Sequence, residues 1–551
     1  MSRSFESLSR EVAIQFLQTV VVVDDCAYFR EDDRVQPHSG LITPGFEQEQ
    51  SSAAPDGSTL SDSAHELDAK VLIDVFAERG LVCAVLAPKL KEDFEEKVIL
   101  SAERADIVIL DWQLQGKTEP ELNAVGIISK ILAKERSHHR IRLIAVYSAE
   151  LPTTILDKIE EMLKENDTFL KEDDYTFIQG ATRICVFAKE DTKRADPKRI
   201  VKAKDLPIML ITEFTKITMG LLSNAALGSM AAIRKNTHRI IGKFNPSLDA
   251  PYLSHRALMA PPAEAESHMS PLIVSEIQSV LDDQNISKYV SKEYIDSWID
   301  NHASSTQLDQ RMKISNSKDA KEAILDLIIN GIDKEITSEQ HEAWSQFLSP
   351  LKSETDGTNL SQLTDILTKD GSSGDAWDRE FAYLMSMCSH YDNPVPMLSL
   401  GSILADGSGG NISYYLCVQP LCDSVRLSKK RMFPFLRMIK AADSDASDFG
   451  FIIRELDGKL IALRLSLRPH ESKMFEFKPG SGQDVILASK EGDLWIFNTF
   501  GEDARKLRWI AELKSAHAQR VSNDYAREIS RVGLNESEWL RRQALNKKKK
   551  E

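Results

Sequence analysis

Several features that mark other classes of protein are scarce or missing in this chain of 551 residues. It has only six cysteines, most of them within apolar runs, so we expect reduced thiols and no disulfide scaffold. No apolar run approaches the ~18 residues that a membrane helix requires. The polar N-terminus also lacks the apolar core of a signal peptide. We therefore expect a cytoplasmic protein without a membrane-spanning segment.

Basic residues are also fewer than acidic residues. The chain has 69 Lys and Arg against 84 Asp and Glu, a net charge of -15, which does not suit a general nucleic-acid binder. What is present, 42% hydrophobic and 28% charged residues, is typical of globular proteins. A chain of this length exceeds one hydrophobic core, so we expect two to four domains.

Apolar runs alternate with amphipathic helical patterns over the first 200 residues. The runs are short and rich in β-branched residues, as in strands that are buried on both faces of a parallel sheet. They span residues 19–25, 81–86, 105–110, 141–147 and 183–188. The alternation predicts an α/β fold with a five-stranded parallel sheet and right-handed crossovers.

Polar side chains stand where four of these strands end. Asp24 and Asp25 close the first strand, Asp111 follows the third, Ser148 the fourth and Lys189 the fifth. In a parallel sheet these ends share one edge, where open α/β sheets bind ligands. Three crowded carboxylates repel one another, and Mg²⁺ with oxygen ligands relieves that repulsion. One acid alone would be read as a solvated turn residue, but the ordered set favours a carboxylate nucleophile for phosphorus.

Residues 15–195 resemble response-regulator receiver domains through the motifs VVVDDC, VILDWQ, AVYS and VFAK. The resemblance implies a flavodoxin-like sheet order and a phosphoacceptor at Asp111. It also implies an Mg²⁺ site formed by Asp24, Asp25, Asp111 and the backbone carbonyl of Gln113.

The same resemblance gives roles to two further residues. Ser148 would be the switch hydroxyl, and Lys189 would pair with the phosphoryl group. Receivers usually have a proline after this lysine, whereas Glu190 follows here. The segment 167–182 and the loops after Asp25 and Asp111 are also longer than usual, so the chain resembles a divergent receiver.

Residues 201–390 have helical patterns. The stretch 204–244 has apolar residues at intervals of three and four, which predicts a long packed helix or a helix pair. Core packing is the favoured role for it, and a seam between two copies of the chain is the alternative. Residues 353–375, rich in Ser, Gly and Asp, read as a linker.

Residues 391–551 predict a β-rich domain that ends in helices over 501–544. Short apolar runs and a hairpin signal at Asp457-Gly458 indicate an antiparallel sheet or small barrel. The predicted strands are 397–404, 413–418, 432–438, 451–455, 460–467, 474–477, 485–488 and 494–497.

These observations predict a response regulator, phosphorylated by a histidine kinase, that is no enzyme beyond its own Mg²⁺-dependent phosphorylation and dephosphorylation. A receiver on a large body without a visible output site resembles the phosphate-buffer component of anti-phage two-component systems. Such a component drains phosphate from a kinase that also serves a separate effector.

Two other functions stay open. Arg-rich helices around Gly533 would suit a transcriptional regulator, although the acidic total argues against DNA binding. A receiver-controlled enzyme is the second alternative. A metal at Cys417 and Cys422, or a pocket lined by titratable groups, would favour that enzyme.

Overall fold

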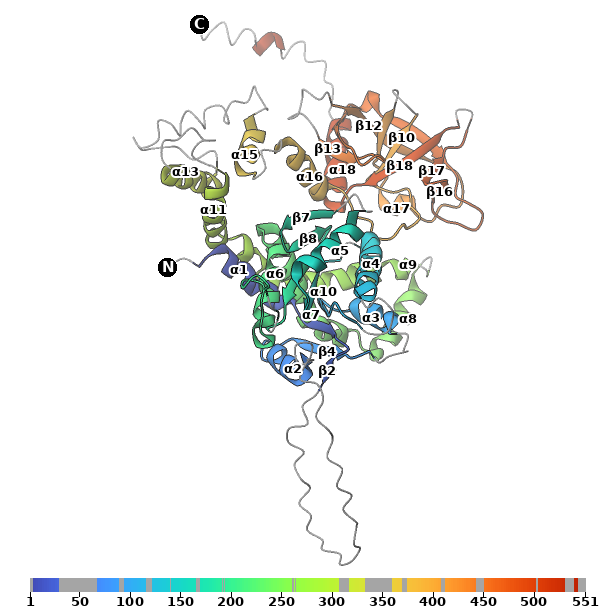
Figure 1. Ribbon diagram of the computed structural model, residues 1–551. Helices are drawn as coiled ribbons and strands as arrows, with labels where there is room; N and C mark the ends of the chain where they lie inside the picture. The colour runs from blue at the N-terminus through green and yellow to red at the C-terminus, as the bar shows by residue number, and fades with distance from the viewer. Residues whose placement is uncertain are drawn as a thin grey trace, which may run out of the picture. The chain divides into compact units, whose positions relative to one another are not determined.

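The computed structural model describes most of the chain, which Figure 1 colours from blue to red. The described residues are 3–28, 67–88, 94–114, 121–138, 140–164, 169–190, 192, 194–259, 262, 264–306, 317–331, 359–368, 374–407, 412–441, 450–501, 504–530 and 540–543. Contacts between them divide the chain into two compact units, 1–301 and 302–551. The finer division into 1–200, 201–390 and 391–551 stays a prediction.

A mixed sheet forms the centre of unit 1, with strand order β4-β1-β5-β6-β9-β8-β7. The first five strands in this order are parallel, and β8 and β7 continue the sheet antiparallel. The bounds are β1 Thr19–Val23, β4 Val82–Leu86, β5 Ile107–Leu110, β6 Arg142–Ser148, β7 Phe169–Asp173, β8 Thr176–Gln179 and β9 Thr182–Ala188.

The predicted five-stranded sheet was therefore wrong in its strand number, although its five parallel strands are present. The additional strands, β7 and β8, come from the long segment 167–182. Gln179 pairs with Thr182 across a two-residue turn whose first residue, Gly180, has φ +58°. Glycine adopts this left-handed conformation without strain, so the chain can reverse directly into β9 and add an antiparallel edge.

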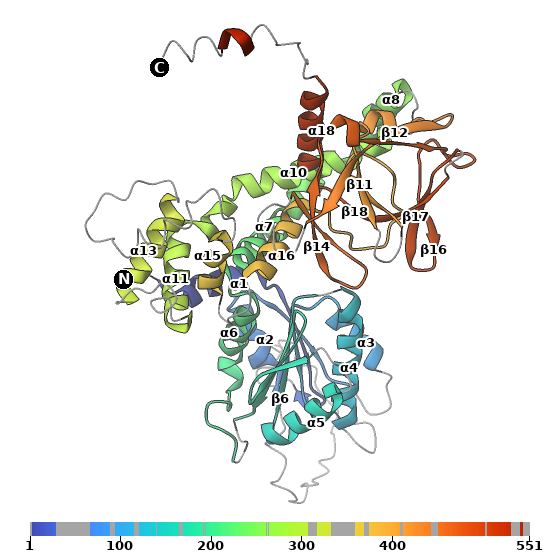
Figure 2. The same cartoon turned by 90° about the horizontal axis from the view of Figure 1, so that it is seen from above.

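Helices cover both faces of this sheet (Figure 2). Alternate residues of β1 point to opposite faces, so Val21 and Val23 belong to one core and Val20 and Val22 to the other. The first core includes α3 Glu95–Ala102, α4 Glu121–His138 and α5 Pro152–Lys164. The second includes α1 Phe5–Phe16, α2 Ala69–Ala77 and α6 Leu206–Thr218.

The apolar stretch 204–244 is a helix pair. α6 ends at Thr218, and α7 Leu221–Lys243 continues at 118° to it. Leu210 and Phe214 of α6 are buried against the sheet, and α7 packs on α1. Within the described residues no single helix is long and apolar enough to cross a membrane, and only this bent pair passes that test when joined.

Short elements complete unit 1. β2 Ala27–Tyr28 and β3 Leu67–Asp68 form a small parallel pair. The other helices are η1 Ala203–Asp205, η2 Pro246–Leu248, α8 Asp249–Leu258, α9 Glu264–Ser267, α10 Met269–Asp283, η3 Ile286–Val290 and α11 Lys292–Thr306, the last of which crosses into unit 2.

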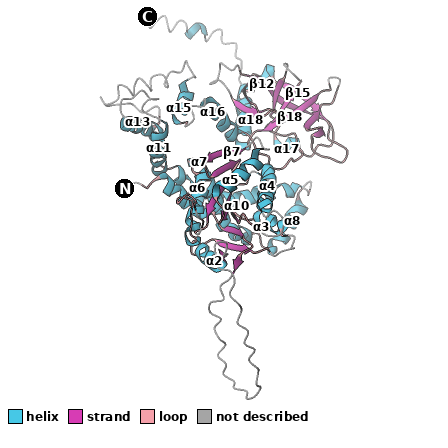
Figure 3. Ribbon diagram, viewed as in Figure 1, coloured by secondary structure: helices cyan, strands magenta, loops and turns pink. Residues whose placement is uncertain are grey.

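Unit 2 combines helices with a nine-stranded antiparallel sheet, whose strands are magenta in Figure 3. The main strand order is β13-β14-β12-β11-β10-β18-β17-β16, and β15 pairs with β12. The strands are β10 Ser402–Asp406, β11 Ser413–Cys417, β12 Arg431–Lys440, β13 Phe451–Arg454, β14 Leu460–Leu465, β15 Lys473–Phe477, β16 Ser489–Glu491, β17 Leu494–Asn498 and β18 Lys506–Glu512. The helices are α13 Ser317–Asn330, α15 Asn359–Leu367, α16 Gly374–Ser386, α17 Leu421–Ser424, η5 Pro469–Glu471 and α18 Ser515–Ile529.

The prediction of a helix over 501–544 was wrong at its start. β18 lies inside the sheet, between β10 and β17. Its Leu507 and Ala511 are buried in two different cores, because the pairing with β10 shifts register between them. This irregular pattern hides the strand, and the surrounding arginines suggested a solvated helix. The predicted strand 485–488 was also misplaced, because only an isolated bridge occurs there and β16 follows it. The region around Gly533 lies outside the described residues.

Candidate functional site

The residues predicted to act together lie at the carboxyl ends of the parallel strands. Asp24 directly follows β1, and its backbone N–H donates to the carbonyl of Leu86 at 3.1 Å. Asp111 directly follows β5, and its N–H donates to Val23 at 2.8 Å. The register therefore brings both carboxylates to one edge of the sheet, as the order of motifs predicts.

Ser148 and Lys189 reach the same edge from the next two strands. Ser148 is the last residue of β6, and Lys189 directly follows β9. The Lys189 N–H donates to the carbonyl of Ser148 at 2.8 Å, so the two residues are neighbours in the sheet. The hydroxyl of Ser148 is buried and accepts the N–H of Glu150 at 3.4 Å.

Lys189 connects the acids. Its Nζ donates to Oδ2 of Asp24 at 2.8 Å and to Oδ2 of Asp111 at 3.2 Å. All three side chains are at most 5% exposed. The ring of Tyr147 lies 5.9 Å from the same ammonium group. Residues 165 positions apart in sequence thus form one buried charged cluster.

Burial and neighbouring charges set the protonation of this cluster. Burial raises the pKa of Asp24 to about 6; the Lys189 ammonium opposes this rise, and the Asp111 carboxylate adds to it. Burial also lowers the pKa of Lys189, but Asp111 and Asp24 outweigh it and leave that pKa raised. The lysine is therefore held in its charged form between the acids.

Backbone N–H groups fix the orientation of both carboxylates. Oδ1 of Asp24 accepts from Cys26 at 2.9 Å, and Oδ1 of Asp111 accepts from Trp112 at 2.8 Å. In each carboxylate the other oxygen faces Lys189. These local bonds fix which oxygen of each acid points toward Lys189.

Asp24, Asp25 and Cys26 have ligand atoms within 4.8 Å of one another, the one such group among the residues that the structure describes. Sequence reasoning did not assign Cys26, although it stands beside the acids in VVVDDC. Burial and then Asp25 raise the pKa of its thiol to about 11, so it stays protonated. The carboxylates are hard oxygen donors and fit Mg²⁺.

The segments that follow β5 and β6 are also connected. The side-chain amide of Gln113 donates to the carboxylate of Glu150. Sequence reasoning missed Glu150, because nothing in its own neighbourhood marks it as a contact of the Asp111 loop. The proposed metal contact of the Gln113 carbonyl stays a prediction.

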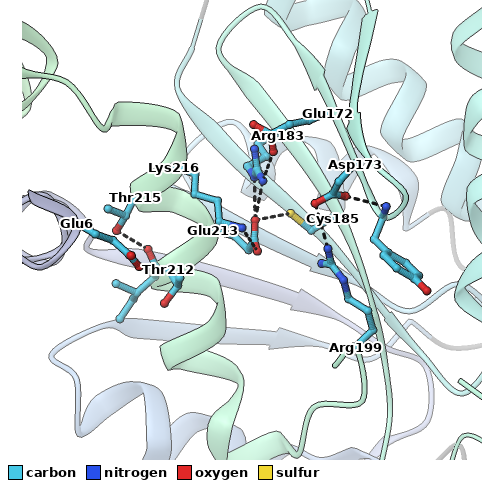
Figure 4. A network of polar contacts seen from close by, with 12 residues as sticks. Glu6, Glu172, Asp173, Arg183, Cys185, Arg199, Thr212, Glu213, Thr215 and Lys216 are labelled. Atoms are coloured by element: carbon cyan, nitrogen blue, oxygen red, sulfur yellow. Dashed lines mark hydrogen bonds and ion pairs between the residues drawn. The ribbon is translucent and has the colours of Figure 1, made fainter. Parts of the chain in front are cut away.

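A second buried polar cluster joins β9 to α6 (Figure 4). Arg183, 1% exposed, donates from Nε to Oε2 of Glu213 at 2.9 Å, and its Nη2 forms an ion pair with the same oxygen at 2.8 Å. Lys216 donates to Oε1 of Glu213 at 2.8 Å. The thiol of Cys185 lies 3.7 Å from the same Glu213 oxygen. Burial would raise the pKa of Glu213, but Lys216 and Arg183 together lower it. This cluster connects β9, the strand that Lys189 follows, with α6.

Residues 16–194 match the family described as the response receiver domain. Comparisons with curated proteins and with solved structures gave no match. The matched span contains the whole mixed sheet and every predicted site residue, while the helices from α6 onward and all of unit 2 lie outside it. Residues 16–194 of this chain are therefore a response receiver domain.

Proposed function

We propose that this protein is a response regulator that accepts a phosphoryl group from a partner histidine kinase on Asp111. The receiver domain supports the general role. The observation that supports the residue is the contact of Lys189 with both Asp111 and Asp24 at the carboxyl edge of the sheet. Such an arrangement presents a carboxylate nucleophile beside a fixed positive charge.

In the proposed reaction an oxygen of Asp111 attacks the phosphorus of phosphohistidine. The O–P bond forms as the P–N bond breaks, and the imidazole leaves with its electron pair and takes up a proton. Lys189 balances the negative charge on the phosphoryl oxygens, and Ser148 donates its hydroxyl hydrogen to one of them. The product is an acyl phosphate at one strand end.

Mg²⁺ is the cofactor that we propose for this site. Asp24, Asp25 and Asp111, with the Gln113 carbonyl, would hold it. When bound, it supplies positive charge that stabilises the transferring phosphoryl group. Asp24 and Asp111 share one lysine, and Asp25 lies beside Asp24, which leaves negative charge for a divalent cation to neutralise.

We further propose that the protein acts in the cytoplasm as a phosphate sink in an anti-phage two-component system. In this role it competes with a separate effector for phosphate from one kinase, and it is no enzyme toward other substrates. The support is the resemblance in architecture, a receiver joined to a large second part. The measurable signature of a sink is an acyl phosphate that hydrolyses quickly compared with kinase turnover.

Phosphotransfer tests this function. The full-length protein is incubated with Mg²⁺ and acetyl phosphate, or with a phosphorylated kinase, as wild type, Asp111→Asn and Asp157→Asn. Asp157 is an exposed acid on α5 and serves as the matched control. We expect hydroxylamine-labile phosphate on wild type and control, and none on Asp111→Asn. Equal labelling of all three proteins would refute Asp111 as the acceptor.

The decay of that label separates the proposed sink from the alternatives. Rapid release of inorganic phosphate supports a sink. A long-lived acyl phosphate, with duplex binding that weakens as salt increases, would instead identify a transcriptional regulator.

A further inference from the structure

Unit 2 contains a cavity of about 690 Å³ at one end of its antiparallel sheet. Residues of β10, β11, β12, β14, β17 and β18 line it, together with the turn that follows β13. Its volume is within the range of small-molecule sites in proteins, roughly 300–1,000 Å³. No part of the receiver domain contributes to it, so the inference below does not depend on phosphorylation.

Strand register explains why the cavity is open. Ala405 of β10 pairs with Tyr414 on one side and with Arg508 on the other. Two long side chains therefore flank a methyl group. Gly407, which directly follows β10, has φ +97° and no side chain. The small residues at this end of β10 therefore leave space between the longer side chains of β11 and β18.

The polar wall of the cavity is a partly buried ion pair. Nη2 of Arg508 donates to Oε2 of Glu455 at 2.8 Å, and these side chains are 16% and 12% exposed. The Tyr414 hydroxyl donates to the other oxygen of Glu455. Burial and Glu455 raise the pKa of Tyr414, so the phenol stays protonated and is a donor instead of a general base.

Arg508 has more N–H donors than Glu455 can accept. A guanidinium carries five N–H groups, and within the described part of the chain only Glu455 accepts a hydrogen bond from this one. Buried polar groups normally have partners, and the planar fork of arginine matches a carboxylate or a phosphate. The cavity beside it is where such an acceptor can bind.

The rest of the lining adds further charged groups and an apolar body. Lys440 and Lys506 line the cavity with Arg508, against Glu455 and Asp457, and Lys506 is itself paired with Glu491 at 2.8 Å. Asp457 accepts the backbone N–H of Lys459 at 3.0 Å within its own turn. The remaining lining is mainly aliphatic, from Ile412, Ile461, Leu494 and Ile496.

We propose that this cavity binds a small organic anion, with its carboxylate or phosphate on Arg508 and its apolar part over Ala405 and Gly407. Unit 2 would then sense a ligand of its own, in addition to the phosphoryl input of the receiver. The structure supports a binding site and not a hydrolytic one, because Glu455 is neutralised by Arg508 and Tyr414 is a protonated donor.

The anionic fluorophore anilinonaphthalene sulfonate is a suitable probe for the full-length protein. We expect saturable binding that Ala405→Leu weakens by about tenfold or more, because the added side chain fills the space between β11 and β18. Glu455→Gln should act in the opposite direction and tighten binding about tenfold, because it removes the competing carboxylate from Arg508. Arg505→Gln is the control, since Arg505 is half-exposed and pairs with Asp406, which is not part of the lining.

Displacement defines the class of ligand. Octanoate and phenyl phosphate should displace the probe, and their relative strength shows whether the site prefers a carboxylate or a phosphate. Octanol should not displace it. Displacement by octanol equal to that by octanoate, or weaker binding to Glu455→Gln, would overturn the assignment to an anion.

A control for folding shows whether each variant is still native. Thermal unfolding is followed for each variant with and without octanoate. If Ala405→Leu fails to fold, Glu455→Gln alone tests the proposal. Octanoate should then raise the melting temperature of Glu455→Gln more than that of wild type. Unchanged probe binding in both variants would place the probe elsewhere and reject the cavity as its site.

Discussion

The two sheets of this protein gather their charged side chains in different ways. In unit 1, Asp24, Asp111 and Lys189 meet at an edge because parallel strands end there together. In unit 2, Tyr414 and Arg508 meet across a face because antiparallel register places them on either side of Ala405. The cluster in unit 1 follows from the order of the strands. The cluster in unit 2 depends on strand register and on the turn after β13, which supplies Glu455. Function is therefore easier to locate from sequence in unit 1.

The largest effect is expected at the buried ion pair behind the receiver sheet. Arg183→Met leaves the buried carboxylate of Glu213 with Lys216 as its remaining ion-pair partner, and removing one partner of a buried pair typically costs about 3–5 kcal/mol. We expect this loss in the free energy of unfolding, together with faster hydrogen exchange in peptides of residues 1–301 and unchanged exchange in the sheet of unit 2. The double variant Arg183→Met with Glu213→Leu removes both charges and should recover most of the stability. If the double variant is no more stable than the single one, the pair is not the source of the loss.

Unit 2 offers the counterpart in β18, a strand inside its sheet. Leu507 is fully buried in β18, and Leu507→Ala should cost about 2–5 kcal/mol through lost packing and a residual cavity. Lys506 on the same strand is exposed, so Lys506→Ala should change stability by less than about 0.5 kcal/mol. Denaturant unfolding and hydrogen exchange of residues 302–551 measure both. Similar losses from the two variants would contradict the strand.

A smaller and conditional effect is expected at the acidic edge. Lys189→Met leaves Asp24 and Asp111 uncompensated, but Asp24 can take up a proton, so we expect a loss of about 2–3 kcal/mol without metal. Added Mg²⁺ should then raise the melting temperature of the variant more than that of wild type, because the cation replaces the missing charge. Exposed Lys70→Met on α2 is the control. An equal Mg²⁺ response in all three proteins would argue against a cation site beside Lys189.

The smallest effect concerns pH and uses Glu213. Because its pKa is lowered in the folded protein, its contribution is present above its ordinary value of 4.5 and is lost as pH falls through the lower folded value. Wild type should therefore lose stability below about pH 4.5 more steeply than Glu213→Gln. Urea unfolding between pH 6 and pH 3.5 gives both slopes. Parallel curves would show that Glu213 is not held ionised by Arg183 and Lys216.

The sequence predicted the receiver part well because each clue was local. The buried run before Asp111 and the acid pair after β1 mark strand ends without any knowledge of their neighbours. Glu150 and Arg183 escaped prediction because their partners, Gln113 and Glu213, are brought near only by the tertiary fold. The hairpin β7–β8 escaped because its strands are short and carry charges, as suits an edge.

The errors in unit 2 have a related cause. The run KLRWIAE alternates polar and apolar residues only over its first four positions, and the arginines in and around it favoured a helix in the prediction. The cavity could not be predicted at all. Arg508 and Tyr414 lie 94 positions apart, and only the pairing of both with Ala405 shows that they lie on either side of it.

The central claim is that Asp111 carries the phosphoryl group, and reduction with borohydride tests it most directly. Borohydride converts a phosphorylated aspartate to homoserine, which mass spectrometry locates in the sequence. After reaction with acetyl phosphate and Mg²⁺, we predict conversion at residue 111 alone, and none in Asp111→Asn. Conversion at Asp24 or Asp25, or no conversion while hydroxylamine-labile phosphate is present, would contradict the account.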